Sequence, residues 1–167
     1  MRYVVLLSGA LGAGCSSGTF RDPLLRHFPM DDLTGIIEQS GIVFDATTSS
    51  DGKGSVKIVA GKPMTVRLYD VDSIDIEKAR LVYRAKVRTE NVTGQVFLEM
   101  WCRFPGKGEY FSRALDQALS GTVGWTTLEA PFILQAGQTP DLVQLNVVVD
   151  GTGTVWVDDI DLVREDL

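Results

Sequence analysis

The stretch Val96-Phe97-Leu98-Glu99-Met100-Trp101-Cys102-Arg103 alternates aliphatic or sulfur-containing side chains with aromatic or charged ones. Successive side chains of a β-strand point to opposite faces of a sheet, so this period of two predicts a strand with one face in the core. The same alternation recurs along the chain, in residues 55–60, 81–88, 143–150 and 156–162. The alternation therefore indicates several half-buried strands along the chain.

Further strands are predicted for residues 36–44, 65–71, 110–115 and 127–134. Glycine-rich or proline-rich turn signals separate the strands, at residues 51–54, 61–63, 105–108 and 150–153. No segment shows an apolar stripe with helical spacing over three turns. We expect an all-β fold of eight or nine strands, arranged as an antiparallel two-sheet sandwich.

Composition narrows the functional classes. The chain has 167 residues, enough for one domain, and a net charge of −6, which argues against a nucleic-acid-binding protein. It contains one histidine and two cysteines, too few for a zinc finger, an iron–sulfur cluster or a disulfide scaffold. Cys102, inside the alternating stretch, is predicted to be a buried core thiol.

The N-terminus is predicted to be a targeting segment. Arg2 precedes an apolar run over residues 3–11, which is too short to span a bilayer. The following Gly12-Ala-Gly-Cys15-Ser-Ser resembles a bacterial lipobox, although that motif usually has a large aliphatic residue where Gly12 stands. The resemblance implies cleavage before Cys15, lipidation of Cys15 and attachment of a secreted lipoprotein to a membrane in the periplasm, the outer membrane or the cell surface. The alternative is plain secretion with Cys15 incidental.

The chain is therefore predicted to have three parts: a signal peptide over residues 1–15, a tether over residues 16–30, and a β-sandwich domain over residues 31–167. The tether contains Pro23 and Pro29 and no clear period, with one helical turn expected around residues 24–27.

Two stretches resemble the CenC-type carbohydrate-binding modules of the galactose-binding-like superfamily. Residues 50–58, Ser-Asp-Gly-Lys-Gly-Ser-Val-Lys-Ile, are similar to an early turn and strand of that group, and residues 151–162, Gly-Thr-Gly-Thr-Val-Trp-Val-Asp-Asp-Ile-Asp-Leu, to its closing strand. The start of the domain, residues 31–37, departs from the usual pattern. The resemblance implies a jelly roll but specifies no ligand, because this fold carries glycan binders, protein binders and structural modules.

One face of the predicted sandwich has the residue types of a sugar-binding surface. If Leu98 and its even-numbered neighbours face the core, Glu99, Trp101 and Arg103 line the opposite face. By the same parity this face is expected to include further polar and aromatic side chains: Arg67, Tyr69, Gln144 and Asn146, together with Arg84 and Lys86. Aromatic planes stack on the C–H faces of sugars, while charged and amide groups bind hydroxyls. The alternative is a structural face in which Glu99 pairs with Arg103 or Arg67. Tyr83, by its parity, is assigned to the core.

Asp158 shares the parity of the core residues of the last strand, so its carboxylate is predicted to point inward and to need partners. The resemblance implies a structural calcium ion near this strand, held by Asp158 together with backbone carbonyls. Calcium prefers oxygen ligands. The alternative is an aspartate that accepts backbone N–H bonds from a neighbouring loop.

The predicted function is non-catalytic recognition of a glycan, with Trp101 as the stacking platform. A glycosidase needs two opposed carboxyl groups, and Glu99 has no evident acidic partner on its face. Trp125 is predicted to be a rim aromatic that fixes a loop, with a role in binding as the alternative. The alternative function is a protein-interaction or structural module in a complex of the cell envelope, without a sugar ligand.

Overall fold

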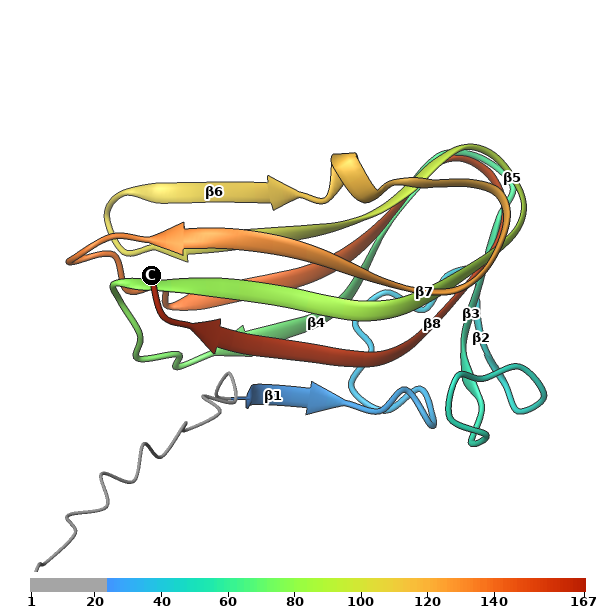
Figure 1. Cartoon of the computed structure of the whole chain (residues 1–167), viewed down its shortest axis with the longest axis horizontal. Coiled ribbons are helices and arrows are strands. Elements are labelled where there is room, and N and C mark those ends of the chain that lie inside the picture. Colours follow the sequence, from blue (N-terminus) through green and yellow to red (C-terminus); the bar gives the residue numbers. More distant parts are fainter. Residues whose placement is uncertain (1–23) are drawn as a thin grey trace, which may run out of the picture.

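The computed structural model describes residues 24–167, and these residues form an all-β sandwich (Figure 1). The predicted fold class is confirmed. In chain order the elements are β1 (Leu24–Phe28), β2 (Ile42–Asp45), β3 (Ser55–Ala60), β4 (Met64–Asp72), β5 (Ala79–Phe104), β6 (Gly108–Arg113), the 3₁₀ turn η1 (Leu115–Gln117), β7 (Leu119–Leu134) and β8 (Leu142–Glu165). The described residues include no helix long and apolar enough to cross a membrane.

Three long strands, β5, β7 and β8, bend over at one end of the molecule, on the right of Figure 1. The bend lets β5 and β8 pair twice: residues 80–90 with 154–165 in one sheet, and residues 93–103 with 142–152 in the other. Gly94 lies at this bend with φ of 85°, and a Cβ there would overlap the carbonyl oxygen of Asp150. A glycine is therefore required where the two backbones approach.

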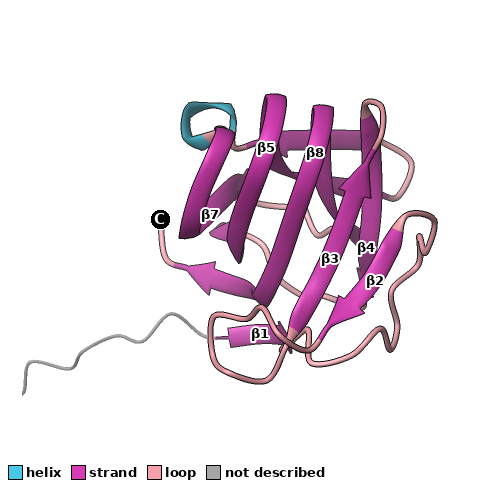
Figure 2. Ribbon diagram, turned by 90° about the vertical axis from the view of Figure 1, so that its right-hand side faces the viewer, coloured by secondary structure: helices cyan, strands magenta, loops and turns pink. Residues whose placement is uncertain are grey.

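The bend divides the molecule into two antiparallel sheets that share β5 and β8. In the first sheet the order is β4, β8, β5 and β6. In the second it is β2, β3, β8, β5 and β7, which lie side by side in Figure 2. The edge of β8 beyond β3 pairs with β1.

The alternating sequence pattern fills the space between the sheets. Leu98, Met100 and Cys102 of β5 are fully buried in one apolar cluster with their counterparts on β8. Tyr83 is also in this core, as predicted, and burial raises the pKa of its hydroxyl well above the ordinary range. Burial likewise raises the pKa of the Cys102 thiol to about 12, so its assignment as a core thiol is confirmed.

Two segment predictions are wrong. Part of the expected tether belongs to the sandwich, because residues 24–28 form β1 rather than a helical turn and pair with β8. Phe28 stacks on Tyr69 at 3.9 Å, and Met30 is buried in the core. The local sequence gave no period for β1 because its contacts are made with a strand at the other end of the chain.

The strand expected over residues 36–44 is shorter, and only Ile42–Asp45 form β2. The backbone N–H groups of Ile37 and Glu38 instead donate to the carbonyl oxygens of Leu68 and Arg67, at 3.1 and 3.0 Å. This loop therefore covers the outer edge of β4. The predicted signal peptide and Cys15 lie outside the described residues.

Candidate functional site

The outer face of the first sheet brings together most of the predicted binding residues. Pairing across β4, β8, β5 and β6 sets Arg67 opposite Asn146, Asn146 opposite Glu99, and Glu99 opposite Arg113. The next row toward the C-terminal end of β5 contains Asp70, Gln144, Trp101 and Phe111. We call this surface, formed by the two rows and by Phe97, Thr65 and Val148 beside them, the groove face.

Glu99 is the fixed centre of the groove face. Its side chain is almost inaccessible to solvent, with 4% of the residue exposed, and both oxygens of its carboxylate accept hydrogen bonds. Trp101 Nε1 donates to Oε1 at 2.7 Å, Asn146 Nδ2 donates to the same oxygen at 3.1 Å, and Arg113 Nε donates to Oε2 at 2.6 Å. Burial alone would raise the pKa of Glu99, but these three hydrogen bonds outweigh it and hold the pKa below its ordinary value. Glu99 is therefore an anion that orients three neighbours.

An aromatic pair lies at one side of Glu99. The rings of Trp101 and Phe111 are 4.9 Å apart and inclined at 45°, and the Arg113 guanidinium lies 4.5 Å from the centre of the Phe111 ring. Phe111 is half exposed, while Trp101 is partly buried with its indole N–H bound to Glu99. The exposed aromatic surface at this point therefore belongs to both residues.

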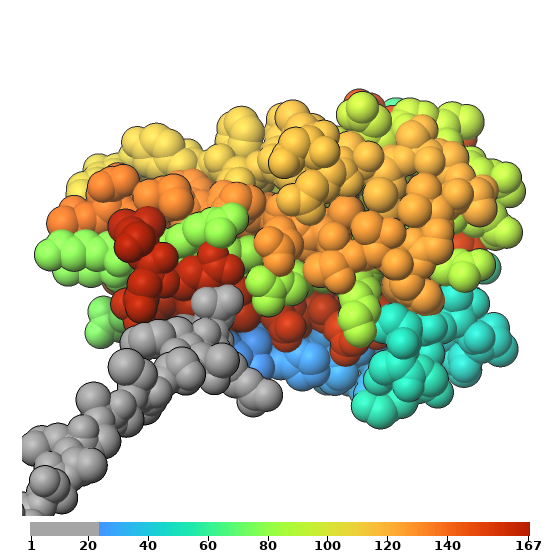
Figure 3. Space-filling view, in the orientation of Figure 1, coloured from blue at the N-terminus to red at the C-terminus, as the bar shows by residue number. Residues whose placement is uncertain are grey.

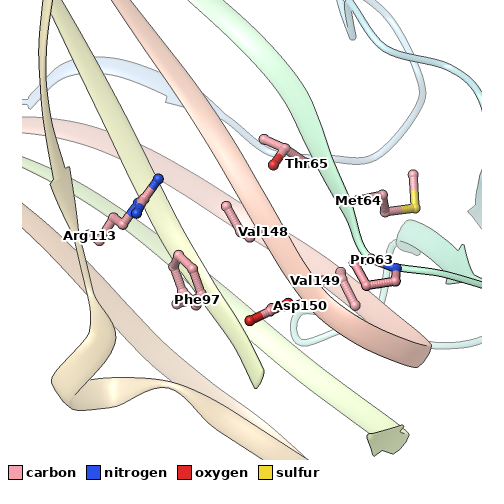
Figure 4. Close-up of a pocket in the computed structure, with 8 residues that line it drawn as sticks. All are labelled: Pro63, Met64, Thr65, Phe97, Arg113, Val148, Val149 and Asp150. Carbon is pink, nitrogen blue, oxygen red and sulfur yellow. The ribbon is translucent and has the colours of Figure 1, made fainter. Parts of the chain in front are cut away.

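The groove face is hollowed beside Arg113, on the other side of the Glu99 row from this pair. A hollow of about 390 Å³ is lined by Pro63, Met64, Thr65, Phe97, Arg113, Val148, Val149 and Asp150. Figure 4 shows Phe97 and Val148 on the central strands, with Arg113 on one flank and Pro63, Met64 and Thr65 of β4 on the other. The floor is therefore apolar, and the flanks carry groups that can form hydrogen bonds.

Asn146 adds an unsatisfied group to this face. Its Nδ2 is bound to Glu99, but its buried Oδ1 has no partner among the described residues. An unpaired buried acceptor costs free energy, so such groups usually have a partner in the working protein.

Arg113 and Phe111 are two members of this face that the sequence did not predict. The strand containing them was expected, but no local pattern indicates which residue of β6 lies opposite Glu99. The ion pairs that the alternative interpretation gave Glu99 are also wrong, because Glu99 pairs with Arg113. Arg67 binds Asp70 through two hydrogen bonds, of 2.7 and 2.5 Å, and Arg103 binds Asp141 through two more, of 2.9 and 3.1 Å.

Tyr69 does not lie on the groove face. A bulge between Arg67 and Tyr69 shifts the pairing of β4 with β8 by one residue, which moves Tyr69 to the core side. Its ring stacks on Phe28, and burial raises its pKa to about 12. Arg84 and Lys86 are also elsewhere, because the bend in β5 places them on the outer face of the second sheet.

Asp158 is fully buried, as predicted, but the parity argument for it is wrong. Val155 and Val157 face the core, so Asp158 lies on the outer side of the second sheet opposite Lys86, where the loop containing Ser50 covers it. The backbone N–H of Ser50 donates to its Oδ2 at 2.7 Å and that of Asp159 to its Oδ1 at 3.0 Å, the arrangement given above as the alternative to calcium. Burial raises the pKa of Asp158, and these hydrogen bonds counteract it only in part.

Two further carboxylates approach Asp158. One oxygen each of Asp31, Asp51 and Asp158 lie within 4.8 Å of one another, and a buried Asp31 Oδ1 has no partner within residues 24–167. Lys53 Nζ is 3.1 Å from Asp51 and 3.9 Å from Asp31, so a cation already balances part of this charge. The donors are hard oxygens and fit calcium, provided that the exposed Lys53 side chain turns toward solvent.

The sequence matches no protein-family model and no curated protein. Solved structures do resemble the sandwich. The xylan-binding domain CBM22-1 of Paenibacillus barcinonensis Xyn10C superposes with a TM-score of 0.64 and 11% identity, over 87% of this chain and 97% of that domain. The fold is that of a β-sandwich carbohydrate-binding module.

Two further structures that contain carbohydrate-binding modules also superpose on this chain. The CBM22-1–GH10 modules of Clostridium thermocellum xylanase 10B, complexed with xylohexaose, give a TM-score of 0.61 at 12% identity, with 86% of this chain covered. This chain spans 29% of that larger protein. TmCBM61 in complex with β-1,4-galactotriose gives a TM-score of 0.51 at 15% identity, over 84% of this chain and 88% of the module. At these identities the likeness establishes the fold.

Proposed function

We propose that the protein is a non-catalytic carbohydrate-binding module and that the groove face receives the glycan. The hollow beside Arg113, with its apolar floor and polar flanks, is the observation that carries the proposal. The similar structures include a xylan-binding domain and TmCBM61 in complex with β-1,4-galactotriose, which supports a sugar as the ligand class.

The groove face offers both apolar rings and hydrogen-bonding groups, and a sugar can use both. The rings of Phe97, Trp101 and Phe111 offer apolar surface to C–H groups, while the Arg113 guanidinium has N–H donors beyond the one bound to Glu99. Glu99 holds Trp101, Arg113 and Asn146 in place before the ligand arrives, so little ordering is left to be done on binding.

The chemistry of Glu99 argues against glycoside hydrolysis. A general acid in such a reaction is protonated near neutral pH and therefore has a raised pKa. The pKa of Glu99 is lowered instead, and its oxygens are already occupied by three donors. Asp158, whose pKa is raised, lies in the second sheet, away from the groove face.

Two neighbouring aromatics of β6 provide a matched test. Phe111 and Tyr110 are 50% and 53% exposed, but they point to opposite sides of the strand, and only Phe111 contacts Trp101. Affinity electrophoresis in gels containing xylan or β-1,4-galactan should show retardation of the wild type and of Tyr110→Ala, and its loss in Phe111→Ala. Equal retardation of both variants would place the sugar elsewhere.

The same exposed surface suits the second candidate, a protein-interaction or structural module of an envelope complex. Specific protein interfaces usually bury more than about 1,000 Å² in total. If no polysaccharide retards the protein, and an envelope extract yields one stable partner that Phe111→Ala no longer captures, the second candidate replaces the first.

We also propose secretion as a lipoprotein, on the strength of the Gly-Ala-Gly-Cys15-Ser-Ser sequence alone. Cells of a bacterial host grown with labelled palmitate should label the wild type but not Cys15→Ala. Absence of label in both, with the protein in the medium, would favour plain secretion.

We propose, finally, that Asp31, Asp51 and Asp158 hold a structural calcium ion, which would link the loop before β3 to β8. The convergence of three carboxylate oxygens and the unpartnered Asp31 Oδ1 support this site. Isothermal titration of the metal-free protein with calcium chloride should show one site in the wild type and none in Asp158→Ala. Heat absent from both would leave Lys53 as the cation of this cluster.

A further inference from the structure

The three tryptophans of the chain, all within the described residues, differ in how their indole N–H groups are used. Trp101 donates to Glu99, and Trp156 donates to Asp45 at 2.8 Å while Lys57 and Arg88 lie over its ring. The Trp125 side chain forms no hydrogen bond, aromatic pair or cation–π contact within residues 24–167, and its Nε1 is not among the buried unpaired atoms. Its polar edge is therefore accessible and uncommitted.

Trp125 borders a hollow on the outer face of the second sheet, opposite the groove face. This hollow, of about 230 Å³, is lined by Ser50, Lys86, Trp125, Thr126 and Thr127. A second hollow of about 260 Å³ shares Lys86 and Thr127 with it and extends toward His27. In Figure 3 the orange surface of β7 and the teal loop before β3 meet on this side of the molecule. The two hollows together form a depression with one aromatic ring and several hydroxyl groups at its edge.

The lysine and the arginine that line this depression are each paired with a carboxylate. Lys86 Nζ lies 2.7 Å from Asp159, and His27 Nδ1 lies 2.7 Å from Asp161. Arg84, farther along, is bound to Glu129 at 2.6 Å. No lysine or arginine lining the depression is left without a carboxylate, so an anionic ligand gains little there. A neutral ligand rich in hydroxyls can instead bind to both the donors and the acceptors.

We infer that this depression is a second carbohydrate-binding site, specific for a neutral sugar unit, with Trp125 as its platform. The indole ring stacks on the C–H face of the sugar, and Nε1–H donates to a hydroxyl or ring oxygen. The hydroxyl of Thr127 and the Lys86–Asp159 pair bind the remaining hydroxyls. This inference rests on the proposed function, since it assigns the same ligand class to a second surface.

Two sites on opposite sheets make the module bivalent. One glycan chain cannot lie flat on both outer faces of the sandwich, so each module holds two chains or two distant parts of one chain. Bivalent contact raises the apparent affinity for a polymer without any new contact within either site.

The three indole N–H signals allow each site to be observed separately by nuclear magnetic resonance. They are assigned in the ¹⁵N-labelled full chain with the variants Trp101→Phe, Trp125→Phe and Trp156→Phe, and the wild type is then titrated with xylohexaose and with β-1,4-galactotriose. A sugar on the groove face moves the Trp101 signal, and a sugar in the depression moves the Trp125 signal. The Trp156 signal, whose N–H is bound to Asp45, serves as the internal control.

We expect saturable shifts of both Trp101 and Trp125, with the Trp125 shift retained in Phe111→Ala. Trp125→Phe keeps a ring but loses one hydrogen bond, and should weaken binding at the depression by about 2- to 10-fold. A shift of Trp101 alone would refute the second site and leave the proposed function intact. A Trp125 shift that disappears in Phe111→Ala would also refute it, because the two residues would then report one site. No shift with either sugar would count against both sites.

Discussion

Replacing Glu99 by glutamine tests whether the groove face is held by one buried anion. The substitution preserves the shape of the side chain. Its amide oxygen can still accept from Trp101 and Asn146 at the position of Oε1, but an NH₂ group then faces Arg113 Nε at the position of Oε2. One charge-assisted hydrogen bond is lost, and such bonds contribute roughly 1.5–3 kcal/mol.

Arg113 is partly exposed, so water solvates the released guanidinium and moderates the loss. We expect Glu99→Gln to reduce the free energy of unfolding by about 2 kcal/mol at pH 7. For a domain of this size that corresponds to a fall in Tm of roughly 4–8 °C. Sugar binding should weaken as well, because Arg113 and Trp101 lose a common anchor.

The lowered pKa of Glu99 also predicts how the stability difference between wild type and Glu99→Gln changes with pH. The pKa of Glu99 is lower in the folded state than in the unfolded chain, so the stabilisation is complete above the unfolded value of about 4.3 and is lost as the pH falls through the folded value. The difference in stability between wild type and Glu99→Gln should therefore be largest near neutrality and shrink below about pH 4.

Urea denaturation at pH 7, 5 and 3.5 measures these differences. The matched control is Glu129→Gln, which breaks the 2.6 Å bond to Arg84 at a site where both side chains are about one-third exposed. Pairs of that kind contribute about 0–1 kcal/mol. If Glu99→Gln costs no more than this control, or if its cost does not decrease at low pH, the carboxylate does not hold the groove face together.

Three other predictions concern the bend, the carboxylate cluster and the core thiol. Gly94→Ala should destabilise the fold by about 3 kcal/mol or more in urea, because the added Cβ overlaps backbone at the bend, whereas Gly121→Ala, with positive φ but open space, should cost only about 1 kcal/mol. Calcium at a hundredfold excess over its Kd should stabilise the wild type by about 2.7 kcal/mol relative to chelator in a thermal scan, and Asp158→Ala should show no such difference. In a Cys15→Ala background, Cys102 should not react with a thiol reagent at pH 8 until the protein unfolds, since burial raises its pKa to about 12; rapid labelling of the native protein would contradict that burial.

Most of the strands, and the side that β5 and β8 bury along residues 96–103 and 143–150, could be predicted from the sequence pattern. The alternation of residues 96–103 and 143–150 was sufficient to place Glu99 and Trp101 on one face with Gln144 and Asn146, because a period of two is a local property of the chain. The buried thiol of Cys102 followed from the same parity. The lipobox-like segment and its lipid anchor remain predictions from sequence.

The contacts between side chains of different strands depend on the tertiary structure, because the register of each strand pair sets them. Arg113, rather than Arg67 or Arg103, binds Glu99 because the register of β6 on β5 is set by the turn between them and by packing. A single bulge moved Tyr69 from the groove face to the core, and the bend in β5 separated Arg84 and Lys86 from Glu99. A parity argument counts residues along one strand, so it fails wherever the backbone inserts a residue or changes sheet. Contacts across strands depend on that geometry, and the sequence pattern does not record it.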